Sequence, residues 1–360
     1  MSQKKIFLLS SFAIFAFLIV FFSFQKSIFK FQATNLDGVK KTQPKKKTLA
    51  DVKIAGTTAY WDGKNAQDAL KTALPYLDSY SPTLYQIEPD GSLGKIDVEY
   101  RQAFLDLAKE AKKPITPNVG DGSDSERVSL LLGDSSIQEK FLQSMVNEAK
   151  KEGFTGWVVD IEALKIQNEK AFTAFIKKAG EILHRNDLKL KVVVFAKTES
   201  NGDNPAEIVE NYKDLGLSAD EIWIMLFGFS NEDTQPGGQT PPSWLRGVLS
   251  YTKTVVPKEK IVVVLSTHGY DWTGGTAEIL DYPQVEERIK KNQAAISYDK
   301  NLSSEVATYS ENGKKHVIWF EDAQTISQKL QIALNEFDID QFALWRIGAE
   351  DPKIWESFKK

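Results

Sequence analysis

The 360-residue sequence contains no cysteine and only three histidines. Without cysteine the chain forms no disulfide and offers neither a thiolate nucleophile nor a cysteine-ligated zinc. The histidines, at 184, 268 and 316, lack the spacing of metal ligands, so neither a metal site nor a histidine-based triad is expected. Gly237 and Gly238 are not followed by a lysine, so no phosphate-binding loop is expected either. The sequence therefore predicts an activity that uses no metal and no cofactor.

The charge of the chain is unevenly distributed. Residues 1–47 contain nine lysines and one acid, Asp37, which leaves 36 basic and 48 acidic residues in 48–360, a net charge of −12. A nucleic-acid-binding surface needs clustered lysine and arginine to neutralise phosphates. The acidic body therefore argues against a nucleic-acid partner. Its length suits one large domain, such as an α/β barrel, or two smaller ones.

Residues 6–24 form an uncharged, apolar run of 19 positions. At 1.5 Å per helical residue, such a run just crosses a hydrocarbon core of about 30 Å. A cleaved signal peptide would have a shorter run that ends in small residues, so an uncleaved transmembrane helix is favoured. Lysines on both sides leave its orientation open. We expect residues 1–30 to be a membrane anchor, 31–50 a flexible lysine-rich linker and 51–360 the functional domain.

Short β-like runs alternate with amphipathic helical runs along the body. The expected strands are 52–61, 80–87, 113–119, 154–162, 188–197, 221–229, 260–270 and 341–348. The expected helices are 98–112, 136–152, 166–186, 205–215, 242–256 and 322–337. Eight strands, most of them followed by a helix, predict a closed (β/α)₈ TIM barrel of the α/β class rather than an open sheet. Residues 273–321 break the rhythm and predict a small α+β insertion after the seventh strand.

The active site of such a barrel forms where its strands end. Several ends contribute aromatic or polar side chains, and those we expect to bind a substrate are Tyr60, Trp61, Asn118, Met225, Phe227, Tyr270, Trp272 and Trp345. A single aromatic residue at a strand end usually packs the rim. Several together favour a sugar-binding bowl, because sugars present flat apolar faces ringed by hydroxyls.

The fourth strand, 154–162, places two carboxyls at its end. Side chains alternate along a strand, so Asp160 and Glu162 share the interior face, roughly 7 Å apart, whereas Trp157 faces the helices. Two carboxyls this close in a partly desolvated pocket do not both ionise easily. The pattern therefore predicts one raised pKa and a general acid for glycosidic cleavage, although a D-x-E triplet is most often a surface pair.

These residues resemble glycoside hydrolase family 18, whose fourth strand carries the pattern DGxDxDxE. The matching segment here is TGWVVDIE, residues 155–162. Further segments are similar to the spore-germination and cortex-lytic branch, which acts on peptidoglycan: VSLLLGD (128–134), TPPSWLRGVLSYTKTVVPKEKI (240–261), GYDW (269–272), HVIWFEDAQTISQKL (316–330) and ALWRIGAEDPKIW (343–355). The resemblance implies a retaining, substrate-assisted mechanism in which Glu162 protonates the leaving oxygen, Asp160 orients the acetamido group and Trp345 forms the floor.

The sequence departs from the family pattern at two places. Thr155 and Val158 replace the first two aspartates, and the Met-x-Tyr-Asp pattern that ends the sixth strand reads Met225-Leu226-Phe227-Gly228. The first hypothesis is a membrane-anchored, monomeric glycosidase outside the cytoplasm, which cleaves β-1,4 bonds of an N-acetylglucosamine-containing polysaccharide, peptidoglycan or chitin-like. The alternatives are a lectin-like barrel that binds such glycans without turnover, and a structural envelope protein that has lost its ligand.

Overall fold

The computed structural model describes residues 47–359, and the predicted membrane helix at 6–24 lies outside this range. No helix within the described range is long and apolar enough to cross a membrane. The predicted linker, 31–50, extends into residues that the structure places in the folded domain. Lys47 forms ion pairs with Asp338 and Asp340, and Leu49 is buried, so residues 47–50 belong to the folded domain.

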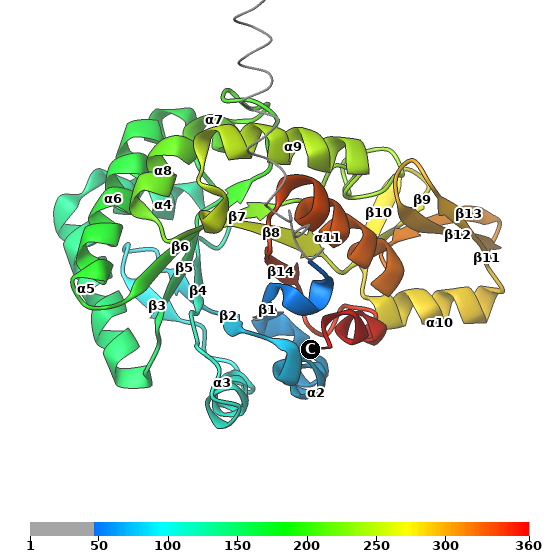
Figure 1. Ribbon diagram of the computed structural model, residues 1–360, viewed down its shortest axis with the longest axis horizontal. Helices are drawn as coiled ribbons and strands as arrows, with labels where there is room; N and C mark the ends of the chain where they lie inside the picture. Colours follow the sequence, from blue (N-terminus) through cyan, green and yellow to red (C-terminus); the bar gives the residue numbers. More distant parts are fainter. Residues whose placement is uncertain (1–46, 360) are drawn as a thin grey trace, which may run out of the picture. The chain divides into compact units, whose positions relative to one another are not determined.

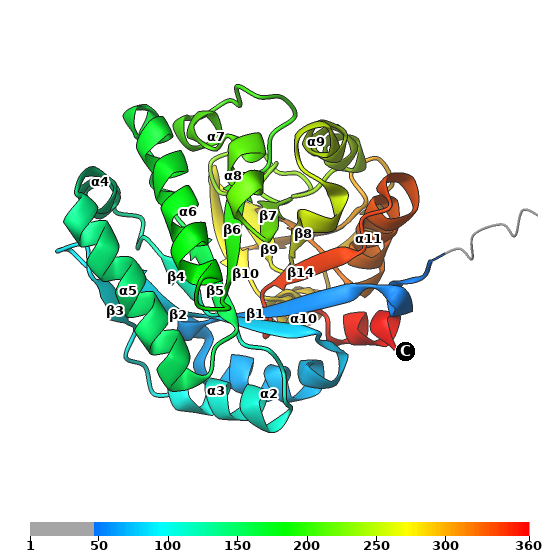
Figure 2. The ribbon, with the colours of Figure 1, turned by 60° about the vertical axis from the view of Figure 1, so that its left-hand side comes forward.

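Eight parallel strands form a closed barrel, as predicted (Figure 2). In their order around the barrel they are β1 (Lys53–Ala59), β2 (Ser79–Ile87), β4 (Asn118–Gly120), β5 (Gly156–Asp160), β6 (Lys189–Phe195), β7 (Glu221–Met225), β8 (Ile261–Ser266) and β14 (Gln341–Trp345). Strand β14 pairs with β1 in parallel, which closes the ring. A short strand, β3 (Leu93–Lys95), pairs with β2 in the antiparallel direction and lies outside the ring.

Helices surround this ring. They are α2 (Gly63–Ala73), α3 (Arg101–Glu110), α4 (Ser125–Gly133), α5 (Ser135–Glu152), α6 (Glu169–His184), α7 (Pro205–Val209), α8 (Tyr212–Ser218), α9 (Pro242–Val255) and α11 (Ala323–Phe337). Asp134 caps the start of α5 by accepting two backbone N–H bonds, and Gly153 ends it in the left-handed conformation. The sequence did not predict α2 and α4, and its single helix at 205–215 is the pair α7 and α8.

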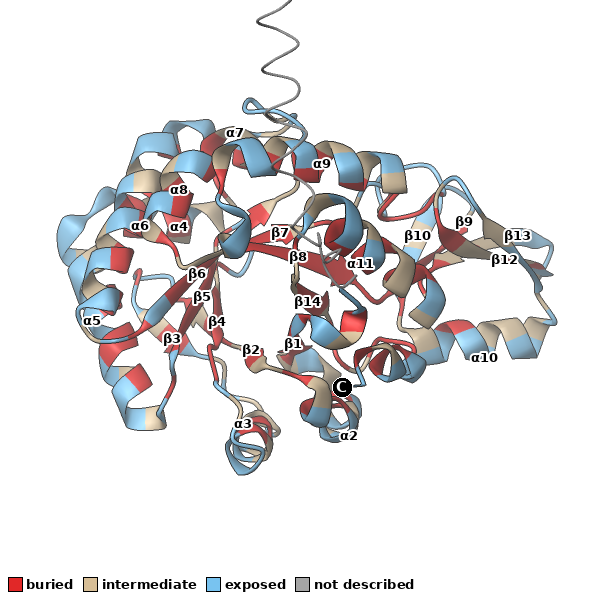
Figure 3. Ribbon diagram, in the orientation of Figure 1, coloured by how far each residue is buried: buried red, intermediate tan, exposed pale blue. Residues whose placement is uncertain are grey.

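The two faces of the barrel strands pack into two separate cores. The larger core lies between the ring and the helices, where Trp157 is fully buried and its Nε1 donates to the Met145 carbonyl of α5. The smaller core fills the barrel interior and includes Val158, Val193 and Trp223. Buried residues accordingly run along the strands, and exposed residues lie on the outer helices (Figure 3). The predicted alternation along 154–162 is therefore correct.

An antiparallel sheet with one helix follows the seventh barrel strand (Figure 1). Its elements are β9 (Gly269–Thr273), β10 (Thr276–Leu280), α10 (Tyr282–Asn292), β11 (Ala295–Asp299), β12 (Ser304–Glu311) and β13 (Lys314–Phe320). This insertion begins at Gly269 rather than at residue 273. The run 260–270, expected as one strand, is divided at Thr267 and His268, where the chain leaves the barrel for the second sheet.

Candidate active site

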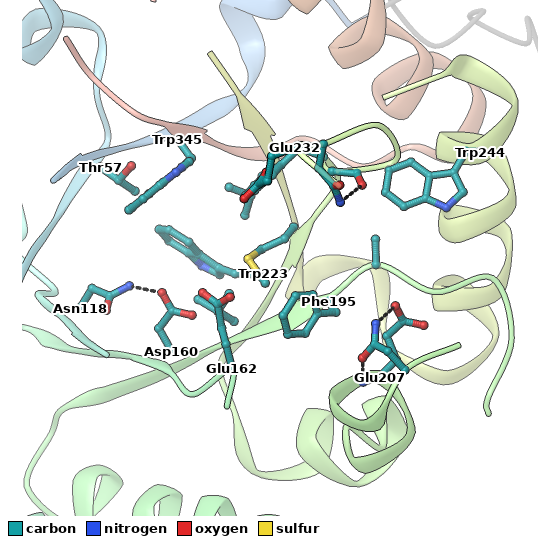
Figure 4. A pocket seen from close by; sticks show the side chains of 18 of the residues that line it. Thr57, Asn118, Asp160, Glu162, Phe195, Glu207, Trp223, Glu232, Trp244 and Trp345 are labelled. Atoms are coloured by element: carbon teal, nitrogen blue, oxygen red, sulfur yellow. Dashed lines mark hydrogen bonds between the residues drawn. The ribbon is translucent and has the colours of Figure 1, made fainter. Parts of the chain in front are cut away.

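Asp160 and Glu162 lie together at the carboxyl end of β5. Both side chains line a cavity of about 480 Å³ at the mouth of the barrel and point side by side into it (Figure 4). The Asn118 side chain at the neighbouring end of β4 donates from Nδ2 to Asp160 Oδ2 at 2.8 Å. Two further oxygens of these side chains, Asn118 Oδ1 and Asp160 Oδ1, are buried and accept no hydrogen bond from the described residues. These two oxygens are therefore buried acceptors whose hydrogen bonds the described residues do not satisfy.

Both carboxyls resist ionisation. Burial is the main cause that raises the pKa of Glu162, and the charges of Asp160 and Asp121 raise it further. Burial likewise raises the pKa of Asp160, although the hydrogen bond from Asn118 opposes the shift. The two groups interact so closely that they lose their protons as a pair. Glu162 keeps solvent access whereas Asp160 is only partly exposed, so Glu162 is the better placed to reach a ligand.

No positive side chain neutralises this pair. The described residues that line the cavity include four carboxyls, Asp160, Glu162, Glu207 and Glu232, but no lysine, arginine or histidine. Within residues 47–359 there is also no group of three potential metal ligands that could hold an ion. The arrangement suits proton transfer to a neutral ligand, because an acid keeps its proton best where no cation favours the carboxylate.

Most of the predicted binding residues surround the acids. Asn118, Met225, Phe227, Tyr270 and Trp345 all line the cavity. The φ angle of Gly228, which follows Phe227 in the wall, is +84°, a conformation that suits glycine.

Three of the predicted binding residues do not line the cavity. Trp61 is 55% exposed, and its ring centroid lies 6.2 Å from that of Trp345, with Tyr60 packed edge-on against it. These two residues therefore lie beside the cavity. Trp272 is buried, and its Nε1 donates to the Thr234 carbonyl. Trp272 lies on the same strand of the insertion, β9, as Tyr270, but only Tyr270 lines the cavity.

His268 lies behind the cavity wall and does not line it. Its Nδ1 is 2.8 Å from Ser266 Oγ, and its Nε2 is 3.4 Å from the Tyr270 hydroxyl. Burial, assisted by the charge of Arg346, lowers the pKa of His268 to about 3. The imidazole is therefore neutral at ordinary pH and supports Tyr270.

Several lining residues were missed in the sequence, namely Thr57, Phe195, Asn204, Glu207, Trp223, Asn231, Glu232 and Trp244. One signal was available for Trp223, because it precedes Met225 by two positions on β7 and so faces the same side. No comparable signal exists for Glu207 on α7 or Trp244 on α9. Their positions depend on how the loops after β6 and β7 fold back over the barrel.

A closed (β/α)₈ barrel with paired acids and aromatic walls at its strand ends is typical of a carbohydrate-active hydrolase. The model of the glycosyl hydrolases family 18 matches residues 11–350. The chain therefore belongs to this family and is a glycosidase that acts on a glycan.

Proteins similar in sequence include two from Bacillus subtilis (strain 168). The cortical fragment-lytic enzyme of Bacillus subtilis (strain 168) is 26% identical over 300 residues, which are 81% of this chain and 69% of that protein. The putative sporulation-specific glycosylase YdhD of the same strain is 25% identical over 310 residues, 82% of this chain and 72% of that protein.

Solved structures share the fold. The spore cortex-lytic enzyme SleL of Bacillus megaterium QM B1551 has a TM-score of 0.78 at 23% identity, covering 86% of this chain and 74% of that one. The chitinase from Chromobacterium violaceum ATCC 12472 has a TM-score of 0.78 at 24% identity, covering 86% of this chain and 98% of that one.

Proposed function

We propose that this protein hydrolyses β-1,4 bonds beside N-acetylated sugars in peptidoglycan or a chitin-like glycan, with Glu162 as the general acid. The observation that carries the proposal is the pair Asp160–Glu162, which faces a cavity without any positive side chain. The pKa of Glu162 is raised, so its carboxyl keeps a proton to donate. The names of the relatives, a cortical fragment-lytic enzyme and a chitinase among them, support the choice of substrate.

The proposed mechanism is retaining and substrate-assisted, so it needs no protein nucleophile. Glu162 donates its proton to the glycosidic oxygen while the bond from that oxygen to the anomeric carbon breaks. The carbonyl oxygen of the substrate's 2-acetamido group attacks the anomeric carbon and forms an oxazolinium ion. Asp160 accepts the acetamido N–H and stabilises the positive charge. Water then attacks the anomeric carbon while the bond from that carbon to the acetamido oxygen breaks, and the Glu162 carboxylate takes up the proton of the water.

The aromatic side chains have separate parts in this proposal. Trp345 lies on the cavity wall opposite the two acids and forms the floor beneath the reacting sugar (Figure 4). The exposed ring of Trp61, beside Trp345, suits a further sugar of the same chain. Met225 at the end of β7, Phe227 just beyond it and Tyr270 of β9 enclose the substrate.

A second candidate function is glycan binding without turnover. It is favoured by Phe227 and Gly228, because a hydroxyl and a carboxylate of the family pattern are both missing there. Removing one donor that stabilises a transition state typically costs about 2.7–4 kcal/mol. A protein that only binds glycans, however, has no need to keep both Asp160 and Glu162.

Hydrolysis assays distinguish the two functions. We expect the wild type to release reducing ends from purified peptidoglycan or to cleave a fluorogenic chitobioside, and Glu162→Gln to lose this activity while still binding chitooligosaccharides. Glu259→Gln, an exposed glutamate near the start of β8, is the matched control and should keep full activity. Glycan binding by a wild type that hydrolyses neither substrate would establish the second function instead. If neither substrate were bound or cleaved, both would be excluded.

We also propose that residues 6–24 anchor the chain in a membrane, with the barrel outside the cytoplasm and acting as a monomer. The apolar, uncharged run supports the anchor, and a cell-wall substrate requires the external location. The full-length chain should stay in the membrane fraction after alkaline extraction and be digested when protease is added to intact spheroplasts. Light scattering should give the mass of one chain. Release by alkali would contradict the anchor.

A further inference from the structure

Asp121 lies just beneath the catalytic pair, in the turn between β4 and α4. It is 4% exposed and does not line the cavity. We propose that Asp121 is a positioning residue: its carboxylate fixes the backbone of Glu162 and supplies the negative charge that keeps the acid in its protonated form. This inference rests on the proposed role of Glu162 and adds a residue on which that role depends.

The contacts of Asp121 show how it fixes Glu162. Strand β5 ends at Asp160, so the backbone N–H groups of Glu162 and Ala163 have no strand partner. Both donate to one oxygen, Asp121 Oδ2, at 2.7 Å and 2.6 Å. A buried N–H without an acceptor is costly. The position of Glu162 beyond the end of the strand therefore depends on this single side chain.

The turn that carries Asp121 has an unusual backbone. Gly122 and Ser123 both have positive φ, +62° and +57°. The left-handed conformation is unfavourable for a residue with a side chain, so Ser123 needs compensation. It receives this from Asp121, because Ser123 N–H donates to Asp121 Oδ1 at 2.8 Å. Both carboxylate oxygens are thus occupied, one by the turn and the other by Glu162.

The negative charge of Asp121 also acts on the Glu162 carboxyl. The hydrogen bonds at the Asp121 carboxyl oxygens all come from backbone N–H groups, and no lysine, arginine or histidine of residues 47–359 forms an ion pair with it. Its charge raises the pKa of both Asp160 and Glu162.

The other groups that face this site do not reverse that effect. They are Asp160 and Asn118 from the barrel, Glu210 from the segment between α7 and α8, and Tyr270 and Trp345 from the opposite wall. None of them carries positive charge. Arg127 of α4 also approaches the turn at Gly122, where its Nε pairs with Asp124 Oδ2 at 3.0 Å. Asp121 adds negative charge beside Glu162 and so favours its protonated form.

Two substitutions separate position from charge. Asp121→Asn keeps an oxygen that can accept the N–H groups of Glu162 and Ala163, but it removes the charge and gives up the bond from Ser123 N–H, because the amide nitrogen cannot accept it. We expect the alkaline limb of its pH–rate profile to move down by about one pH unit, with KM little changed. Asp121→Ala also removes the acceptor, and kcat should fall about 100-fold because Glu162 shifts. Asp134→Asn is the matched control, since Asp134 also accepts two backbone N–H bonds, those of Ser136 and Ile137, but caps α5. Its profile should equal that of the wild type.

A second measurement is independent of turnover. In protein labelled with ¹³C at glutamate carboxyls, the signal absent from Glu162→Gln identifies Glu162, and its titration gives the pKa directly. The pKa should be lower in Asp121→Asn than in the wild type and unchanged in Asp134→Asn. An unmoved Glu162 titration in Asp121→Asn, or wild-type kcat in Asp121→Ala, would overturn the inference and leave the glycosidase function standing. A wild type without activity but with the expected titration shift would instead refute only the function.

Discussion

The two ends of the barrel interior contain different pairs of ionisable side chains: a lysine with a glutamate at one end, and two carboxyls at the other. At the amino end of the strands, Lys191 of β6 is buried, and its Nζ lies 3.2 Å from Glu221 Oε2 of β7. The Trp223 ring lies beside the ammonium and donates from Nε1 to the same glutamate. At the carboxyl end, Asp160 and Glu162 meet without a cation among the residues that line their cavity.

This contrast separates residues that stabilise the fold from residues that take part in the proposed reaction. The charges of Lys191 and Glu221 offset each other, so the pair can stay ionised although burial lowers the pKa of the lysine. Burial instead raises the pKa of both Asp160 and Glu162, and the charge of Asp160 raises that of Glu162 further, so one of the two carboxyls retains a proton. The amino end of the barrel is therefore built to hold the strands together, and the carboxyl end is built to donate a proton.

The largest effect is expected from a Glu→Gln substitution at the carboxyl end of the barrel. Glu162→Gln removes the proton donor, and kcat should fall by about 10²–10⁴-fold, the usual contribution of general acid catalysis. Stability should stay equal or rise, because glutamine is neutral without having to take up a proton in the folded state. Parallel kinetics and urea unfolding measure both. A glutamine variant that turns over like the wild type would remove Glu162 from the mechanism.

At the amino end, Glu221→Gln should act on stability alone. It leaves the Lys191 ammonium buried without its partner, and breaking such a pair costs about 3–5 kcal/mol. Because Glu221 is 19% exposed, we expect the lower end of this range. Urea unfolding at neutral pH measures the loss, and kcat of the folded fraction should be unchanged. A loss of kcat without a loss of stability would contradict the division between the two ends.

Phe227→Tyr tests whether the absence of a tyrosine hydroxyl limits kcat at the carboxyl end of the barrel. It adds a hydroxyl to the cavity wall at the place where the family pattern has tyrosine. We expect kcat to rise about tenfold, a part of the 2.7–4 kcal/mol that one such donor is worth. Phe229→Tyr, two residues further along and 52% exposed, is the control and should change little. Equal kcat for wild type and Phe227→Tyr would mean that another group already supplies this interaction.

The smallest effect is a pH dependence of stability. The folded-state pKa values of Asp160 and Glu162 lie above their unfolded values, so the folded state binds more protons from about pH 4 up to its own pKa values. Stability therefore falls as the pH rises through this window. The variant Asp160→Asn/Glu162→Gln should gain about 1 kcal/mol over the wild type between pH 4 and 9, a figure reduced for the solvent access of Glu162. If the free energies of unfolding of the two proteins changed in parallel with pH, the raised pKa values would be refuted.

Much of the barrel could be predicted from the sequence. Strands such as β8, Ile261–Ser266, are apolar on both faces, a pattern that marks buried parallel strands. The alternation along β5 also placed Asp160 and Glu162 on the inner face, since period two depends only on local geometry. Helix α2 escaped prediction because its buried face consists of small residues such as Ala66 and Ala73 around Leu70.

The rest of the site depends on long-range folding. The chain leaves the barrel at Thr267 and His268 although the β-like pattern continues, so Trp272 lies in the second sheet and does not line the cavity. Glu207 and Trp244 reach the cavity from α7 and α9, and no local pattern shows where these elements will dock. Asp121 directly follows β4, but its hydrogen bonds to Glu162 and Ala163 cross 41 and 42 residues of sequence, which no local pattern shows.

The most direct test of the proposed mechanism is the pH dependence of kcat/KM on an N-acetylated glycan for the wild type and Glu162→Gln. The carboxyl end of the barrel is proposed to keep a proton on Glu162, so wild-type activity should fall along an alkaline limb set by the raised pKa of this group. The glutamine variant should show neither this limb nor appreciable activity. A glutamine variant with the wild-type rate and the same alkaline limb would contradict Glu162 as the proton donor.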